Sequence, residues 1–183
     1  MLDTLGSTRS YKAETMEIFC DTREKNGWSF FTEKMTKKKL DCGDYTTSLL
    51  LGKYAVERKA STGEVYMNLG RTKNMERFHR EIDKLLLLDD AECVFEFSES
   101  DIHCFPENSG IPKFRRPSVK EIDSGKYARG ARVDAWAELR INGRHLKTLI
   151  DRVESRMPII YCGDRRNAEN YVLGRFKELE SKC

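Results

Sequence analysis

Short apolar runs alternate along the chain with longer segments in which apolar residues recur at helical spacing. The runs at residues 16–20, 91–97 and 157–162 are typical of buried strands. Between them, apolar residues three and four positions apart over residues 73–88 and 146–153 predict amphipathic helices, each with one face toward a core. The pattern therefore predicts a chain that alternates between strand and helix.

Two patterns near the N-terminus extend this reading. Residues 46–51 and 54–58 predict two strands joined by a glycine turn, which is an antiparallel hairpin. Trp28, Phe31 and Met35 stand three and four residues apart, and this spacing predicts a short amphipathic helix that packs its apolar stripe in the core.

The expected helix ends follow from small polar residues. Thr62 is the predicted N-cap of a helix over residues 62–69. Residues 136–140 have the pattern of a helix start, which an Asn-Gly pair then interrupts. Asp164, after a glycine, is expected to cap a last helix whose inner face carries alanine, valine, tyrosine, phenylalanine and leucine side chains.

These elements predict an α/β fold with a mixed central β-sheet flanked by helices on both faces. We expect one domain over residues 16–183, preceded by a flexible, polar segment at residues 1–15. From about residue 105 to residue 132 the periodicity disappears, and prolines and glycines mark a long irregular insertion. Structureless connections of this length within a domain are usually functional or disordered.

Composition narrows the class of protein. Apolar residues make up 39% of the chain and charged residues 34%, and no run approaches the roughly 20 apolar residues of a membrane span. The first residues lack the apolar core of a secretion signal, so we expect no membrane association. The expected location is the cytoplasm of a bacterium or of a phage-infected cell, or the nucleus if the protein is eukaryotic. Six scattered cysteines without a C-x-x-C pair argue against structural zinc.

Positive charge is concentrated in one segment. The whole chain carries a net charge of +3, whereas residues 113–132 hold seven basic residues and two acids, a net charge of +5. A basic loop of this kind is typical of contact with nucleic-acid phosphates, and a solvated loop is an equally good interpretation of the charge alone.

The tetrapeptide Val56-Glu57-Arg58-Lys59 carries the candidate chemistry. On a strand, Glu57 and Lys59 project to one face and Arg58 to the other. A carboxylate beside an ammonium suits metal-dependent cleavage of phosphodiesters, because the acid holds a divalent cation and the amine orients the attacking water. Taken alone, the same residues favour an exposed, charged strand, and the acids upstream change that interpretation.

Further acids stand at turns upstream. Asp21 and Glu24 follow the strand predicted at residues 16–20, and the hairpin folds Asp44 back toward Glu57. Hard cations such as Mg²⁺ prefer carboxylate oxygens and keep several waters. Converging acids from separate segments would supply such a site.

The motifs D-T-R-E, G-D-Y and V-E-R-K, in this order, resemble the nuclease domain of the XPF family of structure-specific endonucleases, within the restriction-endonuclease-like superfamily. The resemblance spans roughly residues 16–104 and 144–181. It implies a restriction-endonuclease-like fold, Mg²⁺ or Mn²⁺ as the cofactor, and branched, flapped or nicked DNA as the substrate. It also implies pairing with a second subunit, and a homodimer through the last two helices is one expectation.

The resemblance assigns roles to individual residues. Asp21, Asp44 and Glu57 would bind the metal, with Glu24 lining the site. Lys59 would orient the water, and Arg58 would support the site or the scissile phosphate. The expected DNA-binding residues are Arg23, Arg77, Lys113, Arg115, Arg116, Arg129 and Arg132.

Two departures from the family pattern leave an alternative open. The family usually has an acid four residues after the lysine, whereas Gly63 stands there and Glu64 comes one position later. The chain also lacks the family's helix-hairpin-helix module, and the basic segment is a candidate replacement. The alternative function is a catalytically inactive DNA-binding or scaffold subunit. A standalone nuclease domain would suit a phage or mobile-element protein in recombination or repair.

Overall fold

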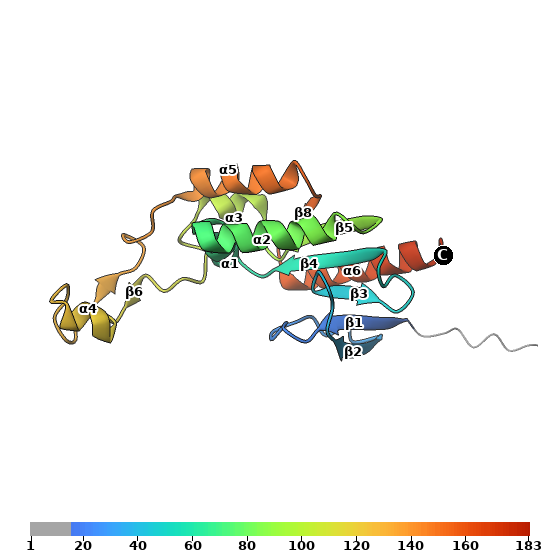
Figure 1. Ribbon diagram of the computed structural model, residues 1–183, viewed down its shortest axis with the longest axis horizontal. Coiled ribbons are helices and arrows are strands. Elements are labelled where there is room, and N and C mark those ends of the chain that lie inside the picture. Colours follow the sequence, from blue (N-terminus) through green and yellow to red (C-terminus); the bar gives the residue numbers. More distant parts are fainter. Residues whose placement is uncertain (1–15) are drawn as a thin grey trace, which may run out of the picture.

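The computed structural model describes residues 16–183, so the flexibility expected for residues 1–15 lies outside the described residues. A six-stranded mixed sheet forms the centre, in the spatial order β2-β1-β3-β4-β5-β8 (Figure 1). The strands are β1 (Glu17–Asp21), β2 (Lys34–Lys38), β3 (Tyr45–Thr47), β4 (Tyr54–Lys59), β5 (Asp90–Phe95) and β8 (Ile159–Tyr161).

Strand direction changes in the middle of the sheet. Strand β3 pairs antiparallel with both β1 and β4, whereas β1–β2, β4–β5 and β5–β8 are parallel pairs. The antiparallel β3–β4 pair forms the predicted hairpin, but its first strand ends at Thr47, and residues 48–53 form the turn instead of continuing the strand to residue 51. Helices lie in the crossovers of the parallel pairs β4–β5 and β5–β8, whereas a loop without a helix joins the parallel strands β1 and β2. The prediction of a mixed sheet is confirmed.

Helices cover both faces of the sheet. One apolar core lies between the sheet and helices α1, α2, α3 and α5, and it includes Ala55 and Phe95 of the strands. The other core lies under α6 and includes Val56, Val94 and Phe176. The helices are α1 (Thr62–Leu69), α2 (Thr72–Leu85), α3 (Glu99–His103), α4 (Val119–Asp123), α5 (Gly143–Glu154) and α6 (Arg165–Glu180).

Alternation along β4 assigns its residues to these two faces. Tyr54 and Val56 belong to the core under α6, whereas Ala55 belongs to the core under α1 and α2. Glu57 and Lys59 continue the face of Ala55, and Arg58 continues the face of Val56, because successive side chains of a strand point to opposite sides. The chemistry-bearing residues thus stand where the strand leaves the core.

The short helix expected from Trp28, Phe31 and Met35 is wrong. Trp28 is buried, but Phe31 is 94% exposed, and Met35 lies within β2 at the edge of the sheet. The backbone N–H of Trp28 donates to the hydroxyl of Tyr45, which fixes this segment in an extended loop. Pairing of β2 with β1 satisfies more backbone groups than one isolated helical turn, so the sheet overrides the local spacing.

Two smaller expectations about helix ends also change. Ser61 is the N-cap of α1, since its hydroxyl accepts a hydrogen bond from the backbone N–H of Glu64, and Thr62 is the first helical residue. Residues 136–138 form a turn and residues 139–140 are irregular, so no helix starts there. Asp164 caps α6 as expected, with its carboxylate accepting from the N–H of Asn167.

The basic insertion contains a small folded unit. Strands β6 (Phe114–Arg115) and β7 (Val133–Asp134) pair antiparallel, and α4 lies between them in sequence. We call residues 113–138 the arm, because this unit projects away from the layered body (Figure 1). Among residues 16–183, no helix is both long enough and apolar enough to cross a membrane.

Candidate active site

The β3–β4 hairpin brings Asp44 and Glu57 together at the end of β4. The backbone N–H of Asp44 donates to the carbonyl of Val56 at 2.7 Å, and the N–H of Arg58 donates to Asp44 Oδ2 at 2.8 Å. Gly43 makes this approach possible, since its φ is +70° and a Cβ there would lie 2.9 Å from the Cβ of Ala55. The glycine of the G-D-Y motif is therefore required by the close packing of two backbones.

An open cavity of about 280 Å³ lies over these residues. Helix α2 forms one side of it, and the loops before β3 and after β1 form another. The lining residues are Arg23, Gly43, Asp44, Glu57, Asn68, Arg77, Phe78 and Glu81. The cavity thus combines carboxylates with two arginines, as expected of a pocket that holds a cation and a phosphate at once.

Lys59 lies beside this pair of acids in a buried position. Its Nζ donates to Glu57 Oε1 at 2.6 Å, lies 3.8 Å from Glu64 Oε1 and is 5.0 Å from the centre of the Phe78 ring. Burial lowers the pKa of Lys59, but the neighbouring Glu57 and Asp44 carboxylates outweigh burial and raise it. The side chain is therefore an ammonium at neutral pH, suited to orienting water and offsetting phosphate charge rather than to removing a proton.

Asp44 is the acid whose charge the protein stabilises least. Burial and then the charge of Glu57 raise the pKa of Asp44 to about 7, although Lys59 and the N–H of Arg58 favour the carboxylate. From residues 16–183, Asp44 Oδ1 receives no hydrogen bond, so one oxygen remains available to a ligand. A cation in the cavity would compensate this charge.

Asp21 has a different environment from the one expected for a metal ligand. Its Oδ1 accepts from the N–H and the Nε of Arg23, both at 2.7 Å, and its Oδ2 accepts from Arg23 Nη2 at 3.2 Å and from the N–H of Leu40 at 2.8 Å. Burial raises the pKa of Asp21, but these hydrogen bonds prevail and lower it. Asp21 therefore braces Arg23, and Arg23 rather than Asp21 lines the cavity.

Arg58 and Glu24 lie behind β4, on the side away from the cavity. Arg58 Nε contacts Glu96 Oε1 at 2.7 Å, and its Nη1 is 3.4 Å from Glu24 Oε1. Trp28 Nε1 donates to the same Glu96 oxygen at 2.6 Å. In this arrangement Arg58 and Glu24 position the strand and the loop after β1, and neither side chain lines the cavity.

Steric crowding explains why residue 63 is a glycine. A Cβ on Gly63 would lie 2.2 Å from the carbonyl oxygen of Ser109, so the backbone that leads into the arm excludes any side chain there. Glu64 Oε2 accepts from the N–H of Ala60 at 2.9 Å, while its Oε1 faces Lys59. Glu64 therefore supplies a carboxylate near Lys59 from the adjacent position.

Among the DNA-binding residues expected from the sequence, Arg23 and Arg77 line the cavity. Arg115 is held within the arm, since its guanidinium contacts Glu121 and Glu138, each at 2.6 Å. By contrast, the other four expected residues are exposed cationic side chains of the arm that have no carboxylate within ion-pair distance in the described part of the chain. These are Lys113, Arg116, Arg129 and Arg132.

Four cavity residues were not among the expected site residues, and two of them, Asn68 and Glu81, have polar side chains. Glu81 lies four residues after Arg77 on α2, so both occupy one face of the helix, and this spacing is a signal that the sequence contained. Asn68 near the end of α1 also lines the cavity, but its side chain carries no pattern that distinguishes it from other polar helix residues.

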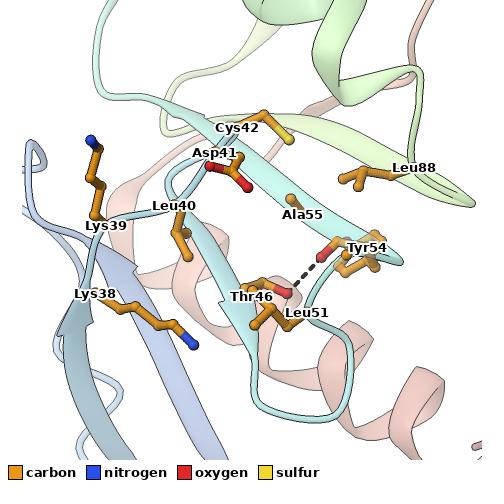
Figure 2. A pocket seen from close by; sticks show the side chains of 11 residues that line it. Lys38, Lys39, Leu40, Asp41, Cys42, Thr46, Leu51, Tyr54, Ala55 and Leu88 are labelled. Atoms are coloured by element: carbon orange, nitrogen blue, oxygen red, sulfur yellow. Dashed lines mark hydrogen bonds between the residues drawn. The ribbon is translucent and has the colours of Figure 1, made fainter.

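A second pocket of about 250 Å³ lies beside the site along the β3–β4 hairpin (Figure 2). Its wall includes Leu51, Ala55 and Leu88, and Lys38 and Lys39 stand at its rim (Figure 2). The pocket is mainly apolar, and neither Asp44 nor Glu57 lines it.

The donor set fits a magnesium ion held mainly by water and substrate. Among residues 16–183, no three His, Cys, Asp or Glu side chains form a ready metal cage. Asp44 and Glu57 nevertheless face one cavity, and Mg²⁺ usually binds through one or two carboxylates while keeping waters and contacting phosphates. These two residues are the ones that would hold the ion.

Comparison with solved structures identifies the architecture. XPF from Aeropyrum pernix superposes on 90% of this chain with a TM-score of 0.54 and 14% sequence identity. The chain has an XPF-like fold. XPF from Aeropyrum pernix in complex with DNA matches 91% of the chain with the same TM-score and identity. The XPF-like region spans 65% and 66% of those two longer chains. No family model and no curated protein sequence matches.

Proposed function

We propose that this protein is a metal-dependent DNA endonuclease that hydrolyses phosphodiester bonds in branched, flapped or nicked DNA. One observation carries the proposal: Asp44 and Glu57 share a cavity with two arginines, and the buried Lys59 ammonium contacts Glu57. The XPF-like fold supports the same assignment, and so does the solved complex of XPF from Aeropyrum pernix with DNA.

The chain's own residues divide the chemistry between them. Asp44 and Glu57 would hold Mg²⁺ or Mn²⁺. When bound, such an ion lowers the pKa of a coordinated water and polarises the phosphate. Lys59 would hold the attacking water in line with its N–H donors and offset charge that develops on the phosphate. Arg23 and Arg77, on the wall of the cavity, would fix the flanking phosphates.

A second candidate is a DNA-binding or scaffold subunit without activity. The observation that favours it is the lack of a three-residue metal cage within residues 16–183. The two candidates share the fold and the basic arm, so only measured cleavage separates them.

Cleavage of labelled fork, flap, nicked and intact duplex DNA tests the proposal. The wild-type chain should cut the branched or nicked substrates with Mg²⁺ or Mn²⁺ and should be inactive in EDTA. Asp44→Asn and Glu57→Gln should each lose activity by orders of magnitude, because each removes one of two cation ligands. Asp89→Asn, at an exposed turn, is the matched control and should retain activity.

Binding to the same DNAs in Ca²⁺ completes the experiment. Both site variants should bind DNA as the wild type does, since the arm is unchanged. Wild-type protein that binds DNA but fails to cut any of the four substrates with either metal would contradict the nuclease assignment and favour the scaffold.

A further inference from the structure

The arm is held rigid by an internal network of ion pairs. Arg115 bridges Glu121 and Glu138, and Lys126 contacts the same two acids at 3.5 and 3.0 Å. The hydroxyl of Tyr127 also donates to Glu138 at 3.1 Å. These contacts pair two of the arm's carboxylates with Arg115 and Lys126, and leave Lys113, Arg116, Arg129 and Arg132 without a carboxylate partner in the described part of the chain.

Phe114 is an exposed aromatic side chain among those cations. Its side chain is 46% exposed, although the β6–β7 pairing holds its backbone. The guanidinium of Arg132 lies 4.4 Å from the ring centre, and Lys113 Nζ lies 5.8 Å from it. Phe114 is therefore an exposed aromatic ring with two cationic side chains within cation–π distance of it.

The base of the arm rests on the helix that follows the candidate active-site strand. The carbonyl of Ser109 lies against Gly63 of α1, and Trp136 Nε1 donates to the carbonyl of Ile111 at 2.9 Å, which joins the two legs of the arm. Figure 1 shows the arm projecting beyond the end of the sheet toward which β4 points. The arm and the carboxyl end of β4 therefore lie at the same end of the molecule.

We propose that Phe114 is a stacking platform for an unpaired base of DNA, with Arg132, Lys113 and Arg116 contacting the adjacent phosphates. Bases in single strands stack on exposed aromatic rings, and nearby cations neutralise the backbone. In an intact duplex the base faces are already stacked on neighbouring bases, so no free face is available for stacking on the ring. The arm would thus select junctions between duplex and single strand. This inference rests on the proposed function, because junction selection matters only to a protein that acts on DNA.

The charge pattern favours nucleic acid over an acidic protein. A protein interface is usually depleted of lysine at its core and combines several apolar anchors. Around Phe114 the ring is instead flanked directly by Lys113 and Arg132, with the exposed Arg116 two residues further along the chain. One aromatic ring among repeated cations is the composition of a single-strand binding surface.

Fluorescence of 2-aminopurine provides a direct readout of stacking. A flap DNA with 2-aminopurine at the first or second unpaired position is titrated with the full-length chain in Ca²⁺, and a blunt duplex of equal length is titrated in parallel. Wild-type protein should quench the unpaired probe on binding. Absence of any change in the probe at saturating protein would overturn the proposal.

Variants assign the effect to the ring. Phe114→Ala should weaken binding to the flap by roughly tenfold and leave duplex binding unchanged, as expected for the loss of one base–aromatic stack. Phe114→Trp should retain the affinity and the quenching, whereas Phe114→Leu should not. Val119→Ala, at the most exposed apolar side chain of the arm, is the matched control and should behave as wild type.

The outcomes remain separate from those of the nuclease test. Asp44→Asn should show full quenching, so a chain that stacks the base but does not cut refutes the nuclease assignment alone. Equal losses on flap and duplex for Phe114→Ala, or an unchanged flap affinity, would refute the platform even if the chain cleaves DNA. An effect of Phe114 on binding of an acidic protein without any effect on DNA would also refute it.

Discussion

Replacing Asp44 with asparagine should stabilise the protein in the absence of divalent cations. The carboxylate is mostly buried and faces Glu57, and both burial and the Glu57 charge raise its pKa to about 7. Asparagine retains an oxygen to accept the hydrogen bond from the N–H of Arg58 and removes the charge. The site therefore sacrifices stability to maintain a charge that a cation would compensate.

The magnitude follows from the difference between the folded and unfolded states. The pKa of Asp44 rises from 3.8 to about 7 on folding, so the folded state binds more protons than the unfolded state between these values. The free energy of unfolding of the wild type consequently falls as pH rises through this window. The full charge penalty is on the order of 2–4 kcal/mol above pH 7, which corresponds to about 5–10 °C in melting temperature.

Thermal unfolding in EDTA at several pH values measures this effect. The melting temperature of Asp44→Asn should exceed that of the wild type at pH 8, and the difference should shrink toward pH 4. Mg²⁺ should raise the melting temperature of the wild type and leave that of the variant almost unchanged, because only the wild type binds the ion. Asp89→Asn should follow the wild type throughout. A variant less stable than the wild type at pH 8 in EDTA would refute the reasoning.

Three further predictions concern residues around the site. Gly63→Glu should destabilise the chain by about 2 kcal/mol or more, because its Cβ would meet the Ser109 carbonyl; denaturant unfolding measures this, and an unchanged midpoint would contradict the steric argument. Arg58→Met should lower stability by roughly 3–5 kcal/mol, since it leaves a buried carboxylate unpaired; a loss of cleavage rate without a loss of stability would instead place Arg58 at the substrate. Arg116→Ala should weaken DNA binding and reduce its salt slope by about one, whereas Arg115→Ala should increase proteolysis of the arm; titrations at several salt concentrations and limited digestion distinguish these two arginines.

The sequence predicted the parts of the site that depend on local geometry. Glu57 and Lys59 share a face because strand alternation requires it, and Asp44 reaches them because a short hairpin joins their strands. The G-D-Y and V-E-R-K motifs are close in sequence, so no long-range packing was needed to relate them. The mixed sheet followed in the same way from the order of strands and helices.

Residues whose orientation depends on distant partners could not be placed from the sequence. Asp21 turns toward the N–H of Leu40, and Arg58 turns toward Glu96, partners that lie 19 and 38 residues away. Nothing in the local motif reports these contacts. The helix expected around Phe31 was wrong for a related reason, because pairing with β1 determines the conformation of the following residues.

The order of the strands leaves β2 at an open edge of the sheet, and three of its five residues are lysines, at positions 34, 37 and 38. A row of ammonium groups along an unpaired edge repels a second copy that approaches as an additional strand. Self-association of this protein by sheet extension is thereby opposed at that edge. The last two helices, through which we expected pairing, pack on opposite faces of the sheet, α5 on one and α6 on the other, so they do not form one common face.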